Sequence, residues 1–299
     1  MHKEMIEFSI IVPTYNRPDR LRGFLERLTQ LNYPRELFEV IVIDDGSEPS
    51  LEPVVDGFRD RLNLVFQRQD HGGVAKGRHA GAIVARGNFL AFTDDDCLPA
   101  PDWLRMLEKA LRSTPNCAAG GLTLNALPKN AYSSATQALI SYLYKHFNAD
   151  KQRAGFFANN NMAMPRGPYL EIGGLDTSWP MCGEDRDLCA RWLDHGYPMT
   201  YVPEAVVYHA HDLTLARFWR QHFNYGRGAY RFHKTCANRR KSQFKVERLS
   251  FYLKLPFAAF AEARGMRAFQ IAGLLLFSQL ANTAGFVTER IKPKQRASA

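Results

Sequence analysis

The sequence contains few cysteines, and they form no recognisable pattern. Five occur in 299 residues, without any C-x-x-C spacing, at positions 97, 117, 182, 189 and 236. An odd, scattered set of this kind favours a reducing compartment and argues against a structural zinc site. Because the first residues, Met1 to Glu4, lack the apolar core of a signal peptide, we expect a cytoplasmic protein.

Internal repeats, low-complexity linkers and nucleic-acid-binding motifs are also absent from the sequence. The net charge of +9 nevertheless favours an anionic partner, such as a nucleotide diphosphate or a phospholipid surface. Nucleic acid ranks last because no motif for it is present. The length and the apolar content of 45% indicate one large globular domain or two small ones.

Three adjacent carboxylates, Asp94, Asp95 and Asp96, follow an apolar run that begins after Asn88. The run predicts a buried strand, and in open α/β sheets ligands bind beyond the carboxyl ends of strands. Strand alternation would direct Asp94 and Asp96 to the same side. Two convergent carboxylates suit Mg²⁺ or Mn²⁺ carrying a substrate diphosphate. The alternative is a charged turn that caps a helix after Pro99.

The rest of the first hundred residues predicts repeated strand–helix–strand units. Further strands are expected at 8–12, 40–43 and 62–66. Apolar residues at helical spacing predict one helix over 21–31 and another after Gly73, with Ala80, Ile83 and Val84 on its apolar face. This order predicts an α/β fold with a mostly parallel sheet and right-handed crossovers.

The pattern changes after residue 100. We expect helices at 103–111 and 185–195, with Leu193 on the buried side of the second, and a mixture of short apolar pieces and Asn-rich loop over 116–165. Two short strands are expected at a sheet edge, where a proline is tolerated, at 201–203 and 205–209.

The last third of the chain is first basic and then apolar. Residues 217–245 are rich in Arg, Lys, His and aromatics, and 251–288 are mostly apolar. The densest apolar piece, Ile271 to Val287, is shorter than the roughly 20 residues of a spanning helix, so a core-packing or interfacial helix is expected. The neighbouring cations suit peripheral contact with the anionic inner face of the cell membrane.

Four motifs occur in order along the chain: Ser9–Arg17, Val42–Ser47, Asp94–Asp96 and Gly183–Leu188. Together they resemble the landmarks of family 2 glycosyltransferases of the GT-A fold, over about residues 6–230. Members of that family are usually inverting and metal-dependent, and they use nucleotide-diphosphate sugars. The resemblance therefore implies a glycosyltransferase.

The resemblance also implies a domain organisation. A GT-A-like mostly parallel sheet flanked by helices would form one domain over 6–230. Its Rossmann-like nucleotide-sugar-binding half would span about 6–100 and its acceptor-binding half about 101–215. A basic and apolar helical C-terminal extension would follow over 231–299.

The donor contacts follow from the same resemblance. It implies that Asp44 or Asp45 accepts a hydrogen bond from the base, and spacing does not separate the two; turn chemistry is the alternative use. Arg78 is expected on the nucleotide, followed by His79 where the family commonly has Asn. Lys76, at the same helix start, suits an anionic ligand or is a solvated charge. The loop beside this site is expected to supply further donor contacts: Pro13, Thr14, Tyr15, Asn16 and Arg17. The alternative is that Asn16 or Asp19 of this segment caps the following helix.

The acidic pair Glu184-Asp185 is expected to act on the acceptor. Asp185 is the candidate general base, which deprotonates the acceptor hydroxyl as it attacks the anomeric carbon. Glu184 and Asp95 are expected substrate contacts. Placement at a helix start also stabilises the helix dipole, which is the alternative role of the acidic pair.

The expected metal ligands are Asp94, Asp96 and His209, with His211 as the alternate histidine. Imidazole can complete a Mn²⁺ site beside two carboxylates, and Mg²⁺ is the other candidate cofactor. An exposed edge histidine without a metal is the alternative.

We therefore expect a hexosyltransferase that uses a UDP- or dTDP-sugar and inverts the anomeric centre. The expected acceptor is a saccharide or a lipid-linked molecule. Two alternatives remain at this point: a sugar-phosphate nucleotidyltransferase, and a non-catalytic subunit that only binds nucleotide sugars.

Overall fold

The structure is a computed structural model that describes residues 6–179, 182–244 and 246–292. The chain divides into two compact units. Unit 1 comprises Met1–Ala126, Tyr144–Pro180 and Glu184–His211, and unit 2 comprises Leu127–Leu143, Met181–Gly183 and Asp212–Ala299. All five cysteines are free thiols.

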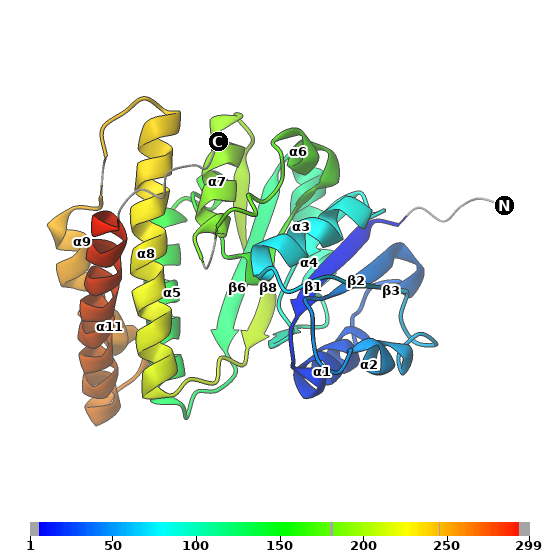
Figure 1. Ribbon diagram of the computed structural model, residues 1–299, viewed down its shortest axis with the longest axis horizontal. Helices are drawn as coiled ribbons and strands as arrows, with labels where there is room; N and C mark the ends of the chain where they lie inside the picture. Colours follow the sequence, from blue (N-terminus) through cyan, green and yellow to red (C-terminus); the bar gives the residue numbers. More distant parts are fainter. Residues whose placement is uncertain (1–5, 180–181, 245, 293–299) are drawn as a thin grey trace. The chain divides into compact units, whose positions relative to one another are not determined.

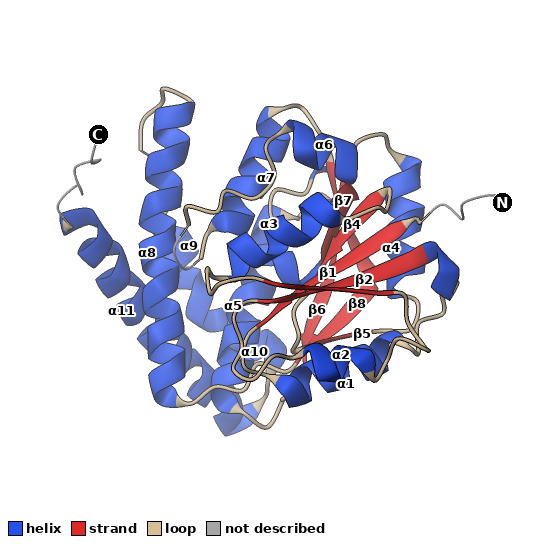
Figure 2. Cartoon of the chain, turned by 45° about the vertical axis from the view of Figure 1, so that its right-hand side comes forward, coloured by secondary structure: helices blue, strands red, loops and turns tan. Residues whose placement is uncertain are grey.

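Unit 1 is built on one eight-stranded mixed sheet with the order β3-β2-β1-β4-β7-β6-β8-β5 (Figures 1 and 2). The first four strands in that order are parallel, which confirms the expected strand–helix–strand units. β7 runs antiparallel to both β4 and β6, and β8 is parallel to β6. The strands are β1 (Phe8–Thr14), β2 (Phe38–Asp44), β3 (Leu64–Arg68), β4 (Phe89–Phe92), β5 (Cys97–Pro99), β6 (Ala118–Asn125), β7 (Met162–Pro165) and β8 (Met199–His209).

Helices cover both faces of the parallel strands. α1 (Pro18–Leu28) and α4 (Trp103–Ser113) share one hydrophobic core with the even-numbered residues of β1, such as Ile10. On the other face α3 (Val74–Val84) lies against Ile11 of β1. The shorter helices of unit 1 are η1 (Arg35–Leu37), α2 (Glu52–Asp56), η2 (Lys151–Arg153), η3 (Asn159–Asn161) and α6 (Arg166–Glu171), and α7 (Glu184–Asp194) follows them.

The predicted apolar face of α3 is wrong. Ile83 and Val84 are exposed, whereas Gly77 and Gly81 face the sheet. A Cβ atom on Gly81 would lie 2.6 Å from Cγ2 of Ile11, so the helix packs too closely for a larger side chain. Hydrophobicity is a poor guide here because the packing surface consists of small residues.

Three further expectations differ from the structure. The segment around Pro203 belongs to one long strand, β8, which lies between β6 and β5 rather than at the edge. Its register with β6 shifts between Gly121 and Leu122, and Pro203 falls in this irregularity, where a proline does not break the ladder. Leu193 is exposed on α7. The predicted mixture of short apolar pieces and loop over 116–165 contains the 17-residue helix α5 (Ala131–Phe147).

Unit 2 is helical. It contains the part of α5 up to Leu143, together with α8 (Leu215–Arg239), α9 (Leu249–Lys254), η4 (Leu255–Ala258), α10 (Ala259–Glu262) and α11 (Gly265–Ile291). The boundary expected at residue 230 falls inside α8. At 27 residues α11 is also longer than predicted, and by length and composition alone it could cross a membrane.

The pairing of α8 with α11 depends on glycine. A Cβ atom on Gly226 of α8 would lie 1.8 Å from the Asn282 carbonyl oxygen, and one on Gly285 of α11 would lie 1.9 Å from the Phe223 carbonyl oxygen. The two helices therefore meet backbone to backbone. Figure 2 shows them side by side.

We expect Gly285→Ala to destabilise the protein by about 3 kcal/mol, because the new methyl group meets backbone atoms that have no rotamer to change. Gly273→Ala on the same helix is the matched control. Nothing lies within 4 Å of a Cβ atom there, so the better helix former should stabilise the protein by about 0.5–1 kcal/mol. Urea unfolding followed by circular dichroism measures both. Equal effects of the two substitutions would contradict the close approach.

Candidate active site

The candidate site lies within unit 1, at the carboxyl ends of β1, β2 and β4. Thr14 ends β1 and Asp44 ends β2. β4 ends at Phe92, so Asp94, Asp95 and Asp96 lie in a turn before β5, and strand alternation does not set the directions of their side chains. The turn aims each carboxylate at a different cationic partner.

Arg78 links two of the predicted site segments. Its side chain is buried, and its two Nη groups bind Asp94 and Glu184, the latter at 3.1 Å. Burial opposes the charge, but the carboxylates of Asp94 and Glu184 raise the pKa of Arg78 above its usual value. The guanidinium expected on the nucleotide therefore lies between two acidic side chains and connects the β4 turn with the start of α7.

Cations at the start of α1 lie against the other two carboxylates. Arg17 Nη1 lies 3.0 Å from Asp95 Oδ1, and Thr14 donates its hydroxyl proton to the same carboxylate at 2.8 Å. Burial raises the pKa of Asp95 to about 6 despite these contacts. Arg20 Nη1 lies 2.6 Å from Asp96 Oδ2. Burial also opposes ionisation of Asp96, but His209, Arg17 and Arg20 lower its pKa to about 2.

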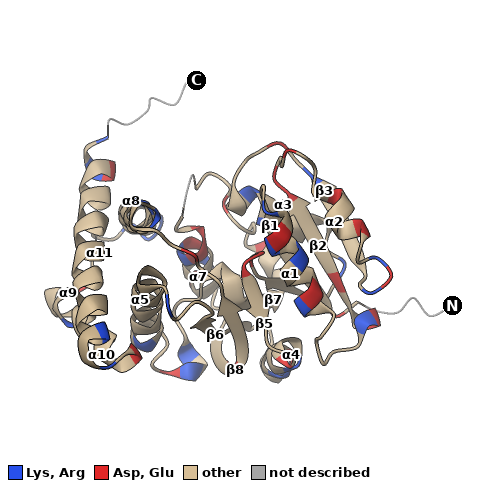
Figure 3. Ribbon diagram, turned by 90° about the horizontal axis from the view of Figure 1, so that it is seen from below, with Lys and Arg blue, Asp and Glu red and all other residues tan. Residues whose placement is uncertain are grey.

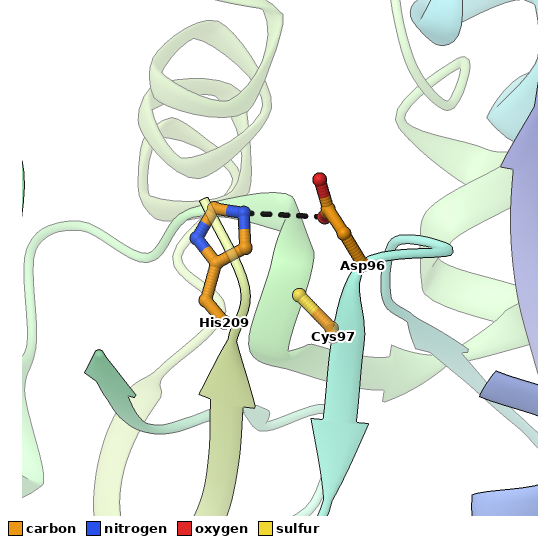
Figure 4. Close-up of side chains that lie close together, drawn as sticks. All are labelled: Asp96, Cys97 and His209. Atoms are coloured by element: carbon orange, nitrogen blue, oxygen red, sulfur yellow. Dashed lines mark ion pairs between the residues drawn. The ribbon is translucent and has the colours of Figure 1, made fainter. Parts of the chain in front are cut away.

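Asp96, Cys97 and His209 offer ligand atoms that all lie within 4.8 Å of one another (Figure 4). The register of β5 with β8 places Cys97 opposite His209, and His209 Nε2 lies 3.2 Å from Asp96 Oδ1. Burial lowers the pKa of His209, but Asp96 raises it more. The Asp96 oxygen and the His209 nitrogen fit a divalent metal such as Mn²⁺, whereas a sulfur donor such as Cys97 suits softer metals. Asp94 is outside this group.

His211 does not join these three residues. Its ring stacks on that of His209, with 4.6 Å between the ring centroids. Burial and the charge of His209 lower the pKa of His211 to about 4. It is therefore a neutral neighbour of the donor group at physiological pH.

The two acidic residues after β2 have different surroundings. Asp44 is fully buried, and its oxygens accept hydrogen bonds from the backbone N–H groups of Ser47 and Leu51, which fixes its own loop. Asp45 accepts hydrogen bonds from the backbone N–H groups of Gly72 and Gly73, at 2.9 and 2.8 Å. Asp45 thus connects the end of β2 with the start of α3.

The loop after β1 borders this region. The ring of Tyr15, which is 42% exposed, stacks on His71 with 4.2 Å between centroids. His71 Nδ1 lies 3.0 Å from Asp45 Oδ2. Asn16 has a φ of 53° and accepts a hydrogen bond from the Glu48 backbone N–H, so it shapes the loop. Pro13 is buried in β1 and Lys76 is exposed on α3.

Asp185 lies in the first turn of α7, next to the Glu184 that binds Arg78. Its carboxylate accepts a hydrogen bond from the Arg186 backbone N–H at 2.7 Å. Burial of the carboxyl group and the neighbouring Glu184 charge raise the pKa of Asp185 to about 7. A carboxylate with this pKa can take up a proton near neutral pH.

Several buried polar atoms near these carboxylates have no hydrogen-bond partner among the described residues. They are Nε of Arg78, Oγ1 of Thr93, and both amide atoms of Asn159. Thr93 precedes the acidic turn, and Asn159 begins η3, which contacts β4. An unpaired buried polar atom costs about 1–3 kcal/mol, so their concentration here favours a bound ligand or ordered water.

Sequence reasoning missed four residues of the site. Arg20 lies one helical turn after Arg17, a spacing that could have indicated it. Cys97 follows Asp96 directly, but only the β5–β8 register reveals its proximity to His209. His71 and Asn159 lie in loop-like sequence that carries no such signal.

Comparison with known proteins identifies the class. A family model described as "Glycosyl transferase family 2" matches residues 9–173, which is more than half of the chain. The chain therefore belongs to glycosyl transferase family 2 and is an enzyme of the glycosyltransferase class. Membership decides against the nucleotidyltransferase and the non-catalytic alternatives.

Two curated relatives illustrate the family. Glycosyltransferase AglE of Haloferax volcanii is 25% identical over 230 residues, covering 74% of this chain and 72% of AglE. Validoxylamine A glucosyltransferase of Streptomyces hygroscopicus is 28% identical over 228 residues, covering 66% of this chain. The chain spans about half of that second relative, 54% of its length.

Solved structures confirm the expected GT-A-like α/β fold. The mannosyltransferase PcManGT from Pyrobaculum calidifontis, in complex with GDP-Man and Mn²⁺, aligns with a TM-score of 0.68 at 20% identity, covering 95% of this chain and 87% of that one. Residues 1–349 of TarS from S. aureus, in complex with UDP-GlcNAc, align with a TM-score of 0.55 at 16% identity, covering 95% and 91%.

We expect Arg78→Met to destabilise the protein by about 3–5 kcal/mol, because it leaves two carboxylates without their buried cation. Adding Glu184→Gln to that variant should recover part of the loss, since one uncompensated charge is removed. Urea unfolding of both variants at neutral pH is the measurement. Unchanged stability of Arg78→Met would show that Arg78 does not balance these charges.

Proposed function

We propose that this enzyme transfers a hexose from a nucleotide-diphosphate sugar to a saccharide or lipid-linked acceptor, with inversion at the anomeric carbon. One observation carries the proposal: Arg78 joins the acidic turn after β4 to the Glu184-Asp185 pair at the start of α7. A group that holds the donor diphosphate and a group that activates the acceptor are thereby adjacent. The acceptor class rests on the basic and apolar C-terminal sequence.

The donor base is proposed to bind between the ends of β1 and β2. Asp44 or Asp45 is proposed as the acceptor for the base N–H, and both oxygens of each carboxylate already accept hydrogen bonds from backbone N–H groups. The partly exposed ring of Tyr15 offers a stacking surface, and His71 lies between Tyr15 and Asp45. The complexes of PcManGT and TarS support a nucleotide-sugar donor. A uridine or thymidine diphosphate sugar is the proposed choice.

Asp96 and His209, with Cys97 beside them, are proposed to hold Mn²⁺ or Mg²⁺. The histidine nitrogen favours Mn²⁺ over Mg²⁺, since Mg²⁺ prefers oxygen ligands. When bound, the ion would neutralise charge that develops on the leaving diphosphate. Arg17 and Arg20 lie on the same carboxylates and add positive charge on that side of the site. Asp94 stays a predicted ligand, although its present partner is Arg78.

Asp185 is the proposed general base, and Glu184 and Asp95 the proposed contacts to substrate. The base must take the acceptor proton during attack, and the raised pKa of Asp185 makes its carboxylate a better proton acceptor than an ordinary aspartate. Glu184 forms an ion pair with Arg78, which also binds the turn after β4. Asp185, the next residue of α7, is therefore held at a fixed position relative to that turn.

The purified enzyme should release nucleoside diphosphate from at least one member of a panel of UDP-, dTDP- and GDP-sugars when Mn²⁺ and a suitable acceptor are present. EDTA should abolish turnover and Mn²⁺ should restore it. Asp96→Asn should lose metal-dependent donor binding, measured by calorimetry, whereas Asp19→Asn on the exposed side of α1 should behave as wild type.

Two results would contradict this assignment. Release of pyrophosphate instead of nucleoside diphosphate would indicate nucleotidyl transfer. Full activity of Asp96→Asn in the presence of EDTA would remove the metal from the reaction.

For the base, we expect Asp185→Asn to lower the rate of transfer by about 10²–10⁴-fold while donor affinity is nearly unchanged. In the wild type the rate should rise with pH through about 7, as Asp185 loses its proton, and this rise should vanish in the variant. Single-turnover rates across a pH series and donor titrations are the measurements.

Stability provides the control for this variant. A folded-state pKa above the unfolded value favours the folded protein at low pH, and this contribution is lost as pH rises through about 7. Asp185→Asn should therefore be more stable than wild type at pH values above 7. A variant that binds donor weakly but keeps its rate of transfer would show that Asp185 acts on the donor instead.

A further inference from the structure

One side of α11 presents large apolar side chains to solvent along its whole length. They are between 47% and 83% exposed: Met266, Phe269, Leu276, Leu280, Val287 and Ile291. The opposite side of the helix is buried within unit 2, where Ala281 is covered and Gly285 faces α8. An exposed face of this extent on a soluble domain marks an interaction surface.

A second row of exposed apolar residues precedes α11. It runs along α9, η4 and α10: Leu249, Leu253, Phe257 and Phe260. The rings of Phe260 and Phe269 are in contact, with 5.4 Å between centroids. The two rows therefore join into one surface, which we call the apolar face.

The charges around the apolar face have one predominant sign. Six exposed cations border it in the sequence: Arg248, Lys254, Arg264, Arg267, Arg290 and Lys292. Of these, Arg267 also donates a hydrogen bond to the Pro128 carbonyl oxygen. From residue 247 to residue 292, all of them described, the acids are Glu247, Glu262 and Glu289, and Glu289 is buried against Arg227 and Arg231. Figure 3 shows α11 tan over most of its length, with charged residues near its ends.

Two aromatic residues of α8 pack against other helices of unit 2. Phe218 is buried against Tyr132, and Trp219 lies 5.1 Å from Phe277. Two of the α8 cations bind the buried Glu289. The apolar face lies on α9 to α11, and Leu215 and Trp219 of α8 are exposed in addition.

We propose that the apolar face docks on an anionic phospholipid surface, with its helices lying in the interface. Apolar side chains would enter the boundary between headgroups and acyl chains, and the bordering cations would bind the lipid phosphates. This inference is independent of the proposed sugar transfer.

A second copy of the chain fits less well. A twofold interface brings the same patch of each subunit together, so the bordering cations would face cations. Gly273 and Thr283 also interrupt the exposed row on α11, where a helix pair would need apolar side chains. A spanning α11 would lose its backbone-to-backbone contact with α8 and the partners of Glu289.

Flotation of the full-length protein with vesicles tests the proposal. Binding to phosphatidylglycerol–phosphatidylcholine vesicles should exceed binding to phosphatidylcholine alone by at least about tenfold at low ionic strength, and it should weaken as salt screens the charges. Each bordering cation removed should lower the partition coefficient about fivefold. Arg248→Gln, Lys254→Gln and Arg264→Gln, combined stepwise, measure this effect.

The apolar contribution is tested by Leu276→Gln/Leu280→Gln, which should lower partitioning at least about tenfold on anionic vesicles. The matched control is Ile83→Gln/Leu193→Gln, which changes two exposed apolar residues of unit 1 and should leave partitioning unchanged. Both variants alter exposed side chains, and their thermal melts should match that of the wild type.

Three outcomes would overturn the proposal. The first is no binding to either vesicle by a monodisperse monomer. The second is a dimer in light scattering that Leu276→Gln/Leu280→Gln converts to monomer without any vesicle binding. The third is protein that alkaline carbonate cannot extract from cell membranes, which would make α11 a span.

Discussion

The buried guanidinium of Arg78 is the interaction on which the candidate site depends. A lone cation in that position would be strongly disfavoured by desolvation, and Asp94 and Glu184 offset this cost from two different elements. α3 can bring Arg78 there because Gly77 and Gly81 let the helix approach β1 and β2 closely. The packing of small residues and the charge balance are thus parts of one arrangement.

The same logic extends to the whole acidic turn. Three adjacent carboxylates would repel one another, yet each has a cationic partner: Arg78 for Asp94, Arg17 for Asp95, and Arg20 with His209 for Asp96. Arg17 also lies 3.5 Å from Asp96. The partners come from the start of α1, from α3 and from β8. Segments far apart in the sequence therefore converge on three consecutive residues.

Much of this could be predicted from the sequence. The apolar runs that begin at Phe8, Val40 and Phe89 predict the central strands, because both faces of a parallel sheet are covered. The spacing of apolar residues from Trp103 to Leu111 predicts the buried side of a helix. Polar residues at strand ends point to the site for the same topological reason.

The remainder could not be read from the sequence because it depends on pairing across the chain. Nothing local to Cys97 indicates that β8 will bring His209 opposite it, or that Arg78 will face Glu184 rather than solvent. The side of α3 that packs on the sheet could not be predicted from hydrophobicity, because its glycines carry no apolar side chain. For α11, the apolar segment predicts a helix. The helix runs from Gly265 to Ile291 and is longer than that segment, because polar residues extend it at both ends.

The glycine contacts of α8 and α11 also set the orientation of the second helix. The glycine of each helix lies close to a backbone carbonyl of the other. A shift of α11 by one residue, about 1.5 Å along its axis, would bring a side chain into the place of a glycine and against that backbone. Rotation about the helix axis meets the same obstacle. The register and rotation of α11 against α8 are therefore fixed. The direction in which Leu276 and Leu280 point is set before any partner binds.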